Sequence, residues 1–67
     1  MQEHIMQFFA YSHLPPDKQA ISMRFAQLAH AIVESTPRNP ERTVALRKLL
    51  ESKDAAVRAS FAKDVQP

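Results

Sequence analysis

Glycine is absent from this chain of 67 residues. The phosphate-binding Walker loop and the dinucleotide-binding fingerprint both need glycine, because only backbone without a Cβ atom approaches phosphate closely enough. Tight hairpin turns of the Asn-Gly type are excluded for the same reason. The missing glycine therefore favours an all-α fold.

Cysteine is also absent, so neither a disulfide nor a thiolate metal site can stabilise the chain. The three histidines, His4, His13 and His30, lack the i, i+4 spacing of a helical metal pair, and we expect no metal and no cofactor. A core of fewer than about 70–80 residues rarely supplies more than a few kcal/mol. We therefore expect one domain spanning residues 1–67 that gains stability by forming a homo-oligomer.

The chain has little excess of one charge and no long apolar run. Its net charge is +2, well short of the basic excess that a duplex DNA binder carries, so duplex DNA is disfavoured as a partner. There is no run of about 18 apolar residues, and Glu3 and His4 stand where a signal peptide would place positive charge and then a hydrophobic stretch. We expect no membrane contact and a cytoplasmic location.

Two amphipathic helices follow an aromatic N-terminal segment, residues 1–14. The first is predicted over residues 16–35, where Pro16 suits a first turn and the apolar residues Ile21, Phe25, Leu28 and Ile32 fall within about 60° of one face. The second is predicted over residues 40–62, with Asn39 as its cap. Its apolar stripe should pack on the first helix in an antiparallel hairpin; the stripe comprises Leu46, Leu49, Leu50, Val57 and Phe61.

Several apolar residues lie off these stripes and together predict a second buried surface, where we place the oligomer contact. They are Met23, Val33, Val44, Ala55, Ala59 and Ala62. Two cations, Arg42 and Lys53, project from the apolar stripe of the second helix. An unpaired charge is costly there, so each either extends its stem to water or meets an anion.

The aromatic cluster before the first helix is either a hydrophobic plug or a stacking platform. We expect Phe8 and Phe9 to pack as core across the open end of the hairpin. Tyr11 and His13 carry polar tips beside Pro15 and are better candidates for stacking on a nucleobase. No nucleophile, base and orienting acid stand in a catalytic pattern, so we expect no enzymatic activity.

The order of residues along the chain resembles the phage anti-CBASS nucleotide-sponge family, also described as the anti-CBASS/anti-Thoeris helical hairpin domain. The resemblance covers about residues 9–61. It rests on the aromatic, histidine and proline segment, on the first helix and on a second helix that opens with Glu, Arg and Thr: Tyr11, His13, Leu14, Pro15, Gln19, Leu28, Ala29, Ile32, Pro37, Glu41, Arg42, Thr43, Ala45, Leu49, Glu51 and Ala56.

The resemblance implies a non-enzymatic protein that sequesters cyclic oligonucleotide immune signals in pockets between the protomers of a homo-oligomer, typically a hexamer, inside the host cell. The family tyrosine that stacks on a cyclic dinucleotide maps onto Tyr11, with His13 beside it. A basic ligand-binding position of the family is Gln27 here, and Arg24 could replace the lost cation. The residues aligned with the second helix, Arg42 and Thr43, are also ligand candidates. Arg58 or Lys63 could line a separate cyclic trinucleotide pocket by symmetry.

Two other functions compete with this one. The hairpin could be a structural adaptor, in which Tyr11 and His13 only close the end of the bundle. It could also be a small nucleic-acid-binding regulator that uses Arg42, Arg47, Lys48 and Arg58, in which case binding should weaken steeply with salt.

Overall fold

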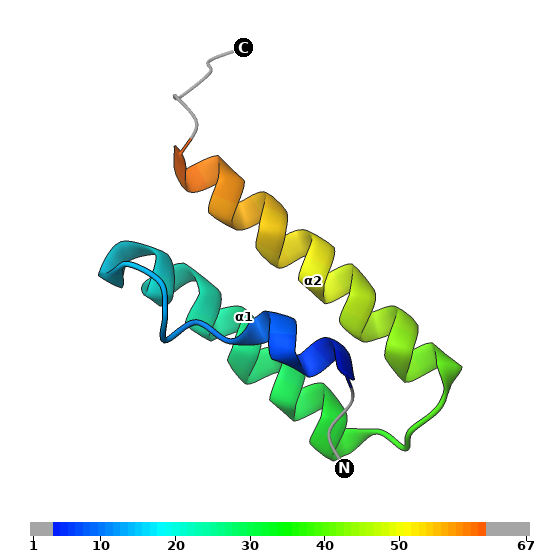
Figure 1. Cartoon of the computed structure of the whole chain (residues 1–67). Coiled ribbons are helices and arrows are strands. Elements are labelled where there is room, and N and C mark those ends of the chain that lie inside the picture. Colours follow the sequence, from blue (N-terminus) through cyan, green and yellow to red (C-terminus); the bar gives the residue numbers. More distant parts are fainter. Residues whose placement is uncertain (1–3, 62–67) are drawn as a thin grey trace.

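The computed structural model of the chain describes residues 4–61, which form three helices (Figure 1). A short 3-10 helix, η1, spans His4–Phe9 and is followed by two long α-helices, α1 at Pro16–Ser35 and α2 at Pro40–Phe61. The expected all-α class and the packing of two long helices are confirmed. Residue 62, the last of the predicted second helix, lies outside the described residues.

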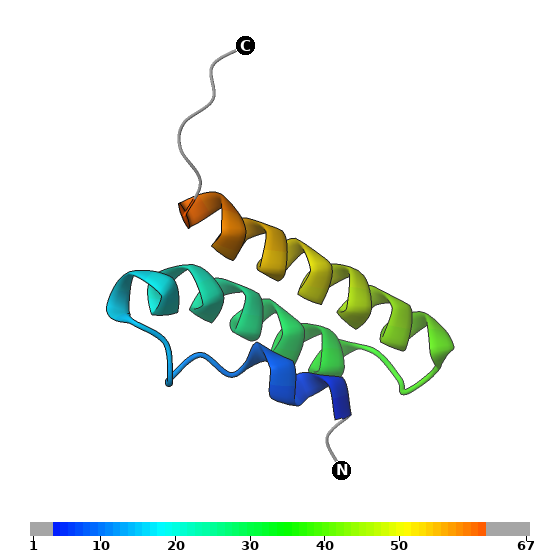
Figure 2. The same cartoon turned by 45° about the horizontal axis from the view of Figure 1, so that its top comes forward.

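The two long helices run side by side in opposite directions, and η1 lies across one face of the pair (Figures 1 and 2). Because η1 contacts both α1 and α2, it covers the groove between them. The N-terminal segment is therefore a third packing element of the hairpin and not an appendage.

Local chemistry explains where the long helices begin and end. The amide of Arg42 donates to Oδ1 of Asn39 at 2.9 Å, so the predicted cap of α2 is confirmed. Helix α1 has no side-chain cap and starts with Pro16, whose fixed φ suits a first turn. At its other end, the amide and the hydroxyl of Thr36 donate to the carbonyl of Ile32 at 3.1 and 2.7 Å.

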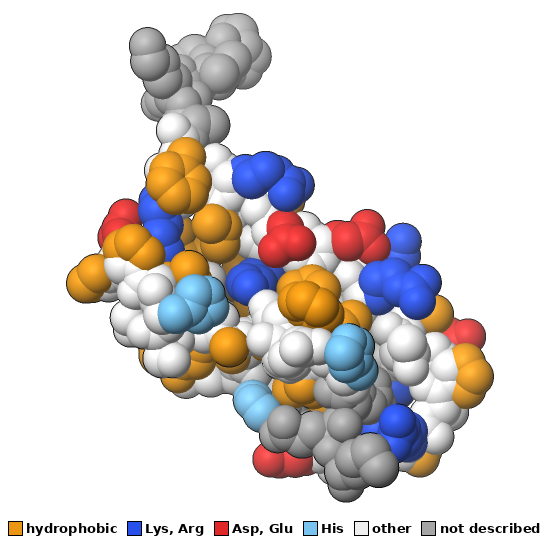
Figure 3. Space-filling view, viewed as in Figure 1, with side chains coloured by type: hydrophobic (Ala, Val, Ile, Leu, Met, Phe, Trp, Pro, Cys, Tyr) orange, Lys and Arg blue, Asp and Glu red, His pale blue; other side chains and the backbone are white. Residues whose placement is uncertain are grey.

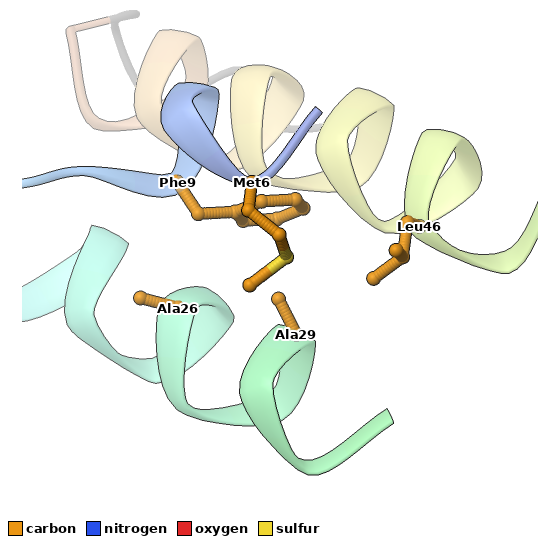
Figure 4. Packing of buried hydrophobic residues seen from close by; sticks show 5 residues of the cluster. All are labelled: Met6, Phe9, Ala26, Ala29 and Leu46. Carbon is orange, nitrogen blue, oxygen red and sulfur yellow. The ribbon is translucent and has the colours of Figure 1, made fainter. Parts of the chain in front are cut away.

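The core is small and is shared by all three helices. Figure 4 shows the side chains of Met6 and Phe9 reaching from η1 toward Ala26 and Ala29 of α1, with Leu46 approaching from α2. All five are buried. The alanines leave room that the larger η1 side chains fill, which is why a short 3-10 helix can dock so closely.

The expectation that both neighbouring phenylalanines pack as core holds for only one of them. Phe9 is 2% exposed, whereas Phe8 is 50% exposed. In a short helix two consecutive side chains point in different directions, so η1 can bury only one of this pair against α1. The other ring contacts His4 edge-on, with 6.0 Å between the centroids.

The buried face of α1 also differs from the predicted stripe. Its buried residues are Lys18, Ser22, Ala26 and Ala29, whose mean direction lies roughly 85° around the helix axis from that of the predicted apolar stripe. Leu28 of that stripe is 51% exposed. The reason is that α1 packs against η1 as well as α2, so its buried face turns toward η1. Val33, expected on an outer surface, is half-buried against the core.

The second helix departs from its predicted stripe only at its end, because Phe61 is 71% exposed. The ammonium of Lys18 lies 3.7 Å from the centroid of this ring and donates to the hydroxyl of Ser60 at 2.6 Å. It also pairs with Asp17 at 3.3 Å. Lys18, which is 7% exposed, thus connects the start of α1 with the end of α2.

Backbone carbonyls accept hydrogen bonds from both Arg42 and Lys53, which neither of the two expected alternatives included. Nη1 of Arg42 donates to the carbonyls of Val33 and Thr36 at 3.1 and 2.9 Å, where α1 ends. Nζ of Lys53 donates to the carbonyl of Phe8 at 2.6 Å. Cations are favourable at the carbonyl ends of helices, so both residues hold the hairpin and η1 together.

Candidate functional site

The hollow that best combines a stacking ring with hydrogen-bonding side chains lies between η1 and α1. We call it the Tyr11 hollow. Its volume is about 340 Å³, and its lining comprises Met6, Gln7, Phe9, Ala10, Tyr11, Ala26, Gln27 and His30. The structure thus brings together Tyr11 and Gln27, two of the predicted ligand residues that lie far apart along the chain.

The position of Tyr11 is fixed by a turn that follows it. The amide of Leu14 donates to the carbonyl of Tyr11 at 3.0 Å and closes the turn. Nε2 of Gln19, in the first turns of α1, donates to the carbonyls of Leu14 and Ser12 at 2.7 and 3.3 Å. The Tyr11 side chain itself is half-buried against the core cluster. Its ring is therefore held in place before any ligand arrives, which lowers the entropic cost of binding.

Besides the Tyr11 hydroxyl, the polar side chains of the Tyr11 hollow are two amides and an imidazole. Gln27 and His30 are exposed and lie one turn apart on α1, on the side of the helix next to the buried Ala26. Gln7 approaches from η1. Among residues 4–61, no lysine or arginine lines this hollow. One protomer can thus supply stacking and hydrogen bonds to bases there, but no fixed cation for a phosphate.

His13 lines a different hollow, of about 470 Å³, together with Gln7, Phe8, Leu50, Lys53 and Asp54. The two candidates Tyr11 and His13, predicted to act side by side, therefore point to different places. Gln7 lines both hollows. The ammonium of Lys53 already donates to the carbonyl of Phe8, and the carboxylate of Asp54 lies at the same rim.

Arg24 lies on the other flank of α1 from the Tyr11 hollow. It lines an apolar hollow of about 390 Å³, the Leu28 hollow, with Ile21, Phe25, Leu28 and Ala56. Gln27 is only three residues further on, but it faces the Tyr11 hollow. Within one protomer, Arg24 and Gln27 thus line different hollows.

The remaining predicted ligand residues are dispersed. Thr43 lines a fourth hollow, near the turn between the long helices, and Arg42 is buried with its Nη1 bound to carbonyls of α1. Arg58 is exposed in the last turn of α2. Lys63 lies outside the described residues. Figure 3 shows histidine side chains exposed on the face that carries η1.

Three polar residues in or beside the Tyr11 hollow were given no ligand role from the sequence. Gln7 and His30 line it, and Gln19 holds the turn that positions Tyr11. Because Gln27 and His30 are three residues apart on a predicted helix, the sequence alone could have predicted that their side chains lie next to each other. No local pattern predicts Gln7, because its position depends on how η1 docks.

The described residues contain no group of three His, Asp or Glu side chains that could hold a metal ion. Neither of the long helices, as far as they are described, is both long and apolar enough to cross a membrane. Comparison of the chain with models of known families, with curated proteins and with solved structures gives no match.

Proposed function

We propose that this protein is a non-enzymatic sponge that binds cyclic oligonucleotide signals and withholds them from a host defence effector. The observation that carries the proposal is the Tyr11 hollow, in which a prepositioned aromatic ring stands beside the side chains of Gln7, Gln27 and His30. The proposal also rests on the resemblance of the sequence to the nucleotide-sponge family.

The chemistry of the hollow suits a nucleobase. Stacking of a base on an aromatic ring contributes about 1–3 kcal/mol, and it tolerates any base because every base has a π face. The amides of Gln7 and Gln27 can donate to and accept from the edge of the same base. Binding of this kind removes a signal from solution by mass action, so no catalytic group is required.

The size and charge of the hollow require a second protomer. A volume of about 340 Å³ lies at the lower end of the range for drug-sized ligands, so the hollow takes one base and its sugar but not a whole cyclic dinucleotide. The two phosphates also need cations, and the described lining supplies none. A neighbouring copy would complete the pocket from both sides by symmetry.

The apolar surface around the Leu28 hollow provides a further contact for self-association. Ile21 and Phe25 are only half-buried and Leu28 is 51% exposed, although these residues form the most apolar stripe of α1. This surface lies on the other flank of α1 from Tyr11. A hexamer with dihedral symmetry needs at least two different interfaces, so one can bury Leu28 while another encloses the ligand.

The test is isothermal titration of the full chain with a panel of cyclic dinucleotides and trinucleotides, with linear dinucleotides as controls. We expect Tyr11→Ala to weaken binding of a cyclic dinucleotide about tenfold or more, and Tyr11→Phe, which keeps the ring, to retain most of it. Gln27→Lys should tighten binding because it adds the cation that the family has at this position.

Sedimentation equilibrium of Leu28→Glu, with Lys48→Glu as an exposed control of α2, tests the assembly. The Leu28 variant should dissociate into smaller species. No affinity for any cyclic ligand from a folded, associated wild-type protein would refute the sponge and favour a structural adaptor. Retention of duplex DNA that falls steeply with salt would favour the nucleic-acid-binding regulator instead.

A further inference from the structure

We infer that the end of the hairpin at the α1–α2 turn carries a second, separate site for a small ligand with a terminal phosphate. The site is the hollow of about 270 Å³ lined by His4, Ile5, Arg38, Thr43 and Arg47, which we call the turn hollow. It shares no lining residue with the Tyr11 hollow, and the inference goes beyond the proposed sponge function.

The turn that carries Arg38 is held rigidly. Pro37 and Pro40 fix the backbone on either side of it. Oδ1 of Asn39 accepts from the amide of Arg42, and Nη1 of Arg42 donates to the carbonyl of Thr36 at 2.9 Å. The turn is thereby tied to the N-terminal end of α2, so Arg38 stands in a defined place relative to that helix.

Helix α2 contributes two further ligand groups from one face. Thr43 and Arg47 are four residues apart, so their side chains lie one above the other. The hydroxyl of Thr43 donates to the carbonyl of Asn39 at 3.4 Å, which is long for an O–H···O bond. That weak bond can be exchanged for a shorter one to a phosphate oxygen. His4 closes the hollow from η1.

The charge of the turn hollow differs from that of every other hollow described here. Two guanidinium groups line it, and none of its lining residues is acidic. Within residues 4–61, the side chains of Arg38 and Arg47 form no hydrogen bond or ion pair with the protein, so both remain available. By contrast, the cationic hollow at Lys53 includes the carboxylate of Asp54.

Size and charge together select the ligand class. A phosphomonoester or a pyrophosphate group carries about two negative charges or more near neutral pH, which two arginines balance with bidentate hydrogen bonds. A hollow of about 270 Å³ is smaller than the usual pocket for a drug-sized ligand. It therefore accommodates a terminal phosphate group and not a whole cyclic dinucleotide, whose phosphates are diesters with one charge each.

The test is titration of the full ¹⁵N-labelled chain with inorganic pyrophosphate, followed by amide chemical shifts. We expect shifts concentrated at Arg38, Thr43 and Arg47, and saturation with a single dissociation constant. Arg47→Gln should weaken this binding about tenfold, as loss of a charged hydrogen bond requires. Its matched control is Lys48→Gln, the next residue on the same helix with the same change in net charge; it should weaken binding less than twofold.

Failure of the phosphate site and failure of the sponge can be told apart, because each is tested by a different variant. Tyr11→Ala should leave pyrophosphate binding unchanged, and Arg47→Gln should leave cyclic dinucleotide binding unchanged. Both arginines are exposed, so Arg38→Gln and Arg47→Gln should fold, which far-ultraviolet circular dichroism checks. The inference would be overturned if Arg47→Gln and Lys48→Gln lost pyrophosphate affinity equally, or if the amide shifts were spread over all cationic surfaces. Either result would mean that pyrophosphate responds only to the net charge of the protein.

Discussion

The strongest prediction from the fold concerns Arg42, which is 8% exposed and joins α2 to the end of α1. We consider Arg42→Met, which keeps an unbranched apolar stem and removes the guanidinium. The variant loses the hydrogen bonds to Val33 and Thr36, at 3.1 and 2.9 Å, and leaves these carbonyls without that donor. A hydrogen bond that involves a charged group contributes about 1.5–3 kcal/mol.

The two bonds share one nitrogen, and methionine recovers part of the buried contact, so we expect a loss of about 2–4 kcal/mol in the free energy of unfolding. A chain of this size has only a few kcal/mol of stability to lose. Each kcal/mol corresponds to about 4–8 °C in the melting temperature of a 60–100-residue domain. Arg42→Met should therefore melt roughly 8–32 °C below the wild type, or be unfolded at room temperature.

The measurement is thermal and urea unfolding followed by circular dichroism, at equal protein concentrations because association shifts the apparent stability. The matched control is Arg47→Met, an exposed arginine of the same helix, which should change the free energy by less than about 0.5 kcal/mol. Arg42→Lys should fall between them, since it keeps the charge but loses the planar fork. Equal stability of the two methionine variants would refute the role assigned to Arg42.

Three further predictions test other contacts of the hairpin. Ser22 is 0% exposed, and its hydroxyl has no hydrogen-bond partner among the described residues. Because an unpaired buried hydroxyl is destabilising, Ser22→Ala should raise the unfolding free energy by about 1 kcal/mol, and a lower value would contradict this. The hydrogen bond from Lys18 lowers the pKa of Asp17. The stability that this pair contributes is therefore present above the ordinary pKa of an aspartate and is lost as the pH falls through the lowered value. In Lys18→Met, this contribution should disappear from the acid side of a plot of unfolding free energy against pH. Gln19→Ala should free the turn after Tyr11, costing about 1 kcal/mol and broadening the amide resonances of that turn; unchanged line widths would count against the tether.

The helix limits were readable from the sequence because they depend on local chemistry. Pro16 cannot sit inside a helix but suits its first turn, and Asn39 before Pro40 offers a cap that the next turn uses. The buried face of α1 was predicted wrongly because periodicity ranks faces by the size of their apolar residues. The alanines at positions 26 and 29 rank low on that scale, yet they form the face that admits η1.

The ligand roles of the candidate site residues stay predictions, but the structure shows which of these residues share a hollow. Tyr11 and Gln27 line the same one. His13 and Arg24 line other hollows: His13 lies within the turn that Tyr11 begins, and Arg24 lies beside Leu28 and Phe25 on α1. Which side chains share a hollow depends on docking, and docking is not a local property of the sequence.

The cations show most clearly that local sequence and docking give different information. From the sequence, Arg42 and Lys53 stand on an apolar stripe, and water or an anion was the expected partner of each. In the structure, carbonyls at the ends of α1 and η1 accept hydrogen bonds from both. A cation used in this way is costly to divert to a ligand, since the carbonyls would lose their donor. Arg38 received no role from the sequence and Arg47 only one in nucleic-acid binding, but in the structure they line one hollow and have no partner within residues 4–61. A search for phosphate binding should therefore begin at the turn and not at the buried cations.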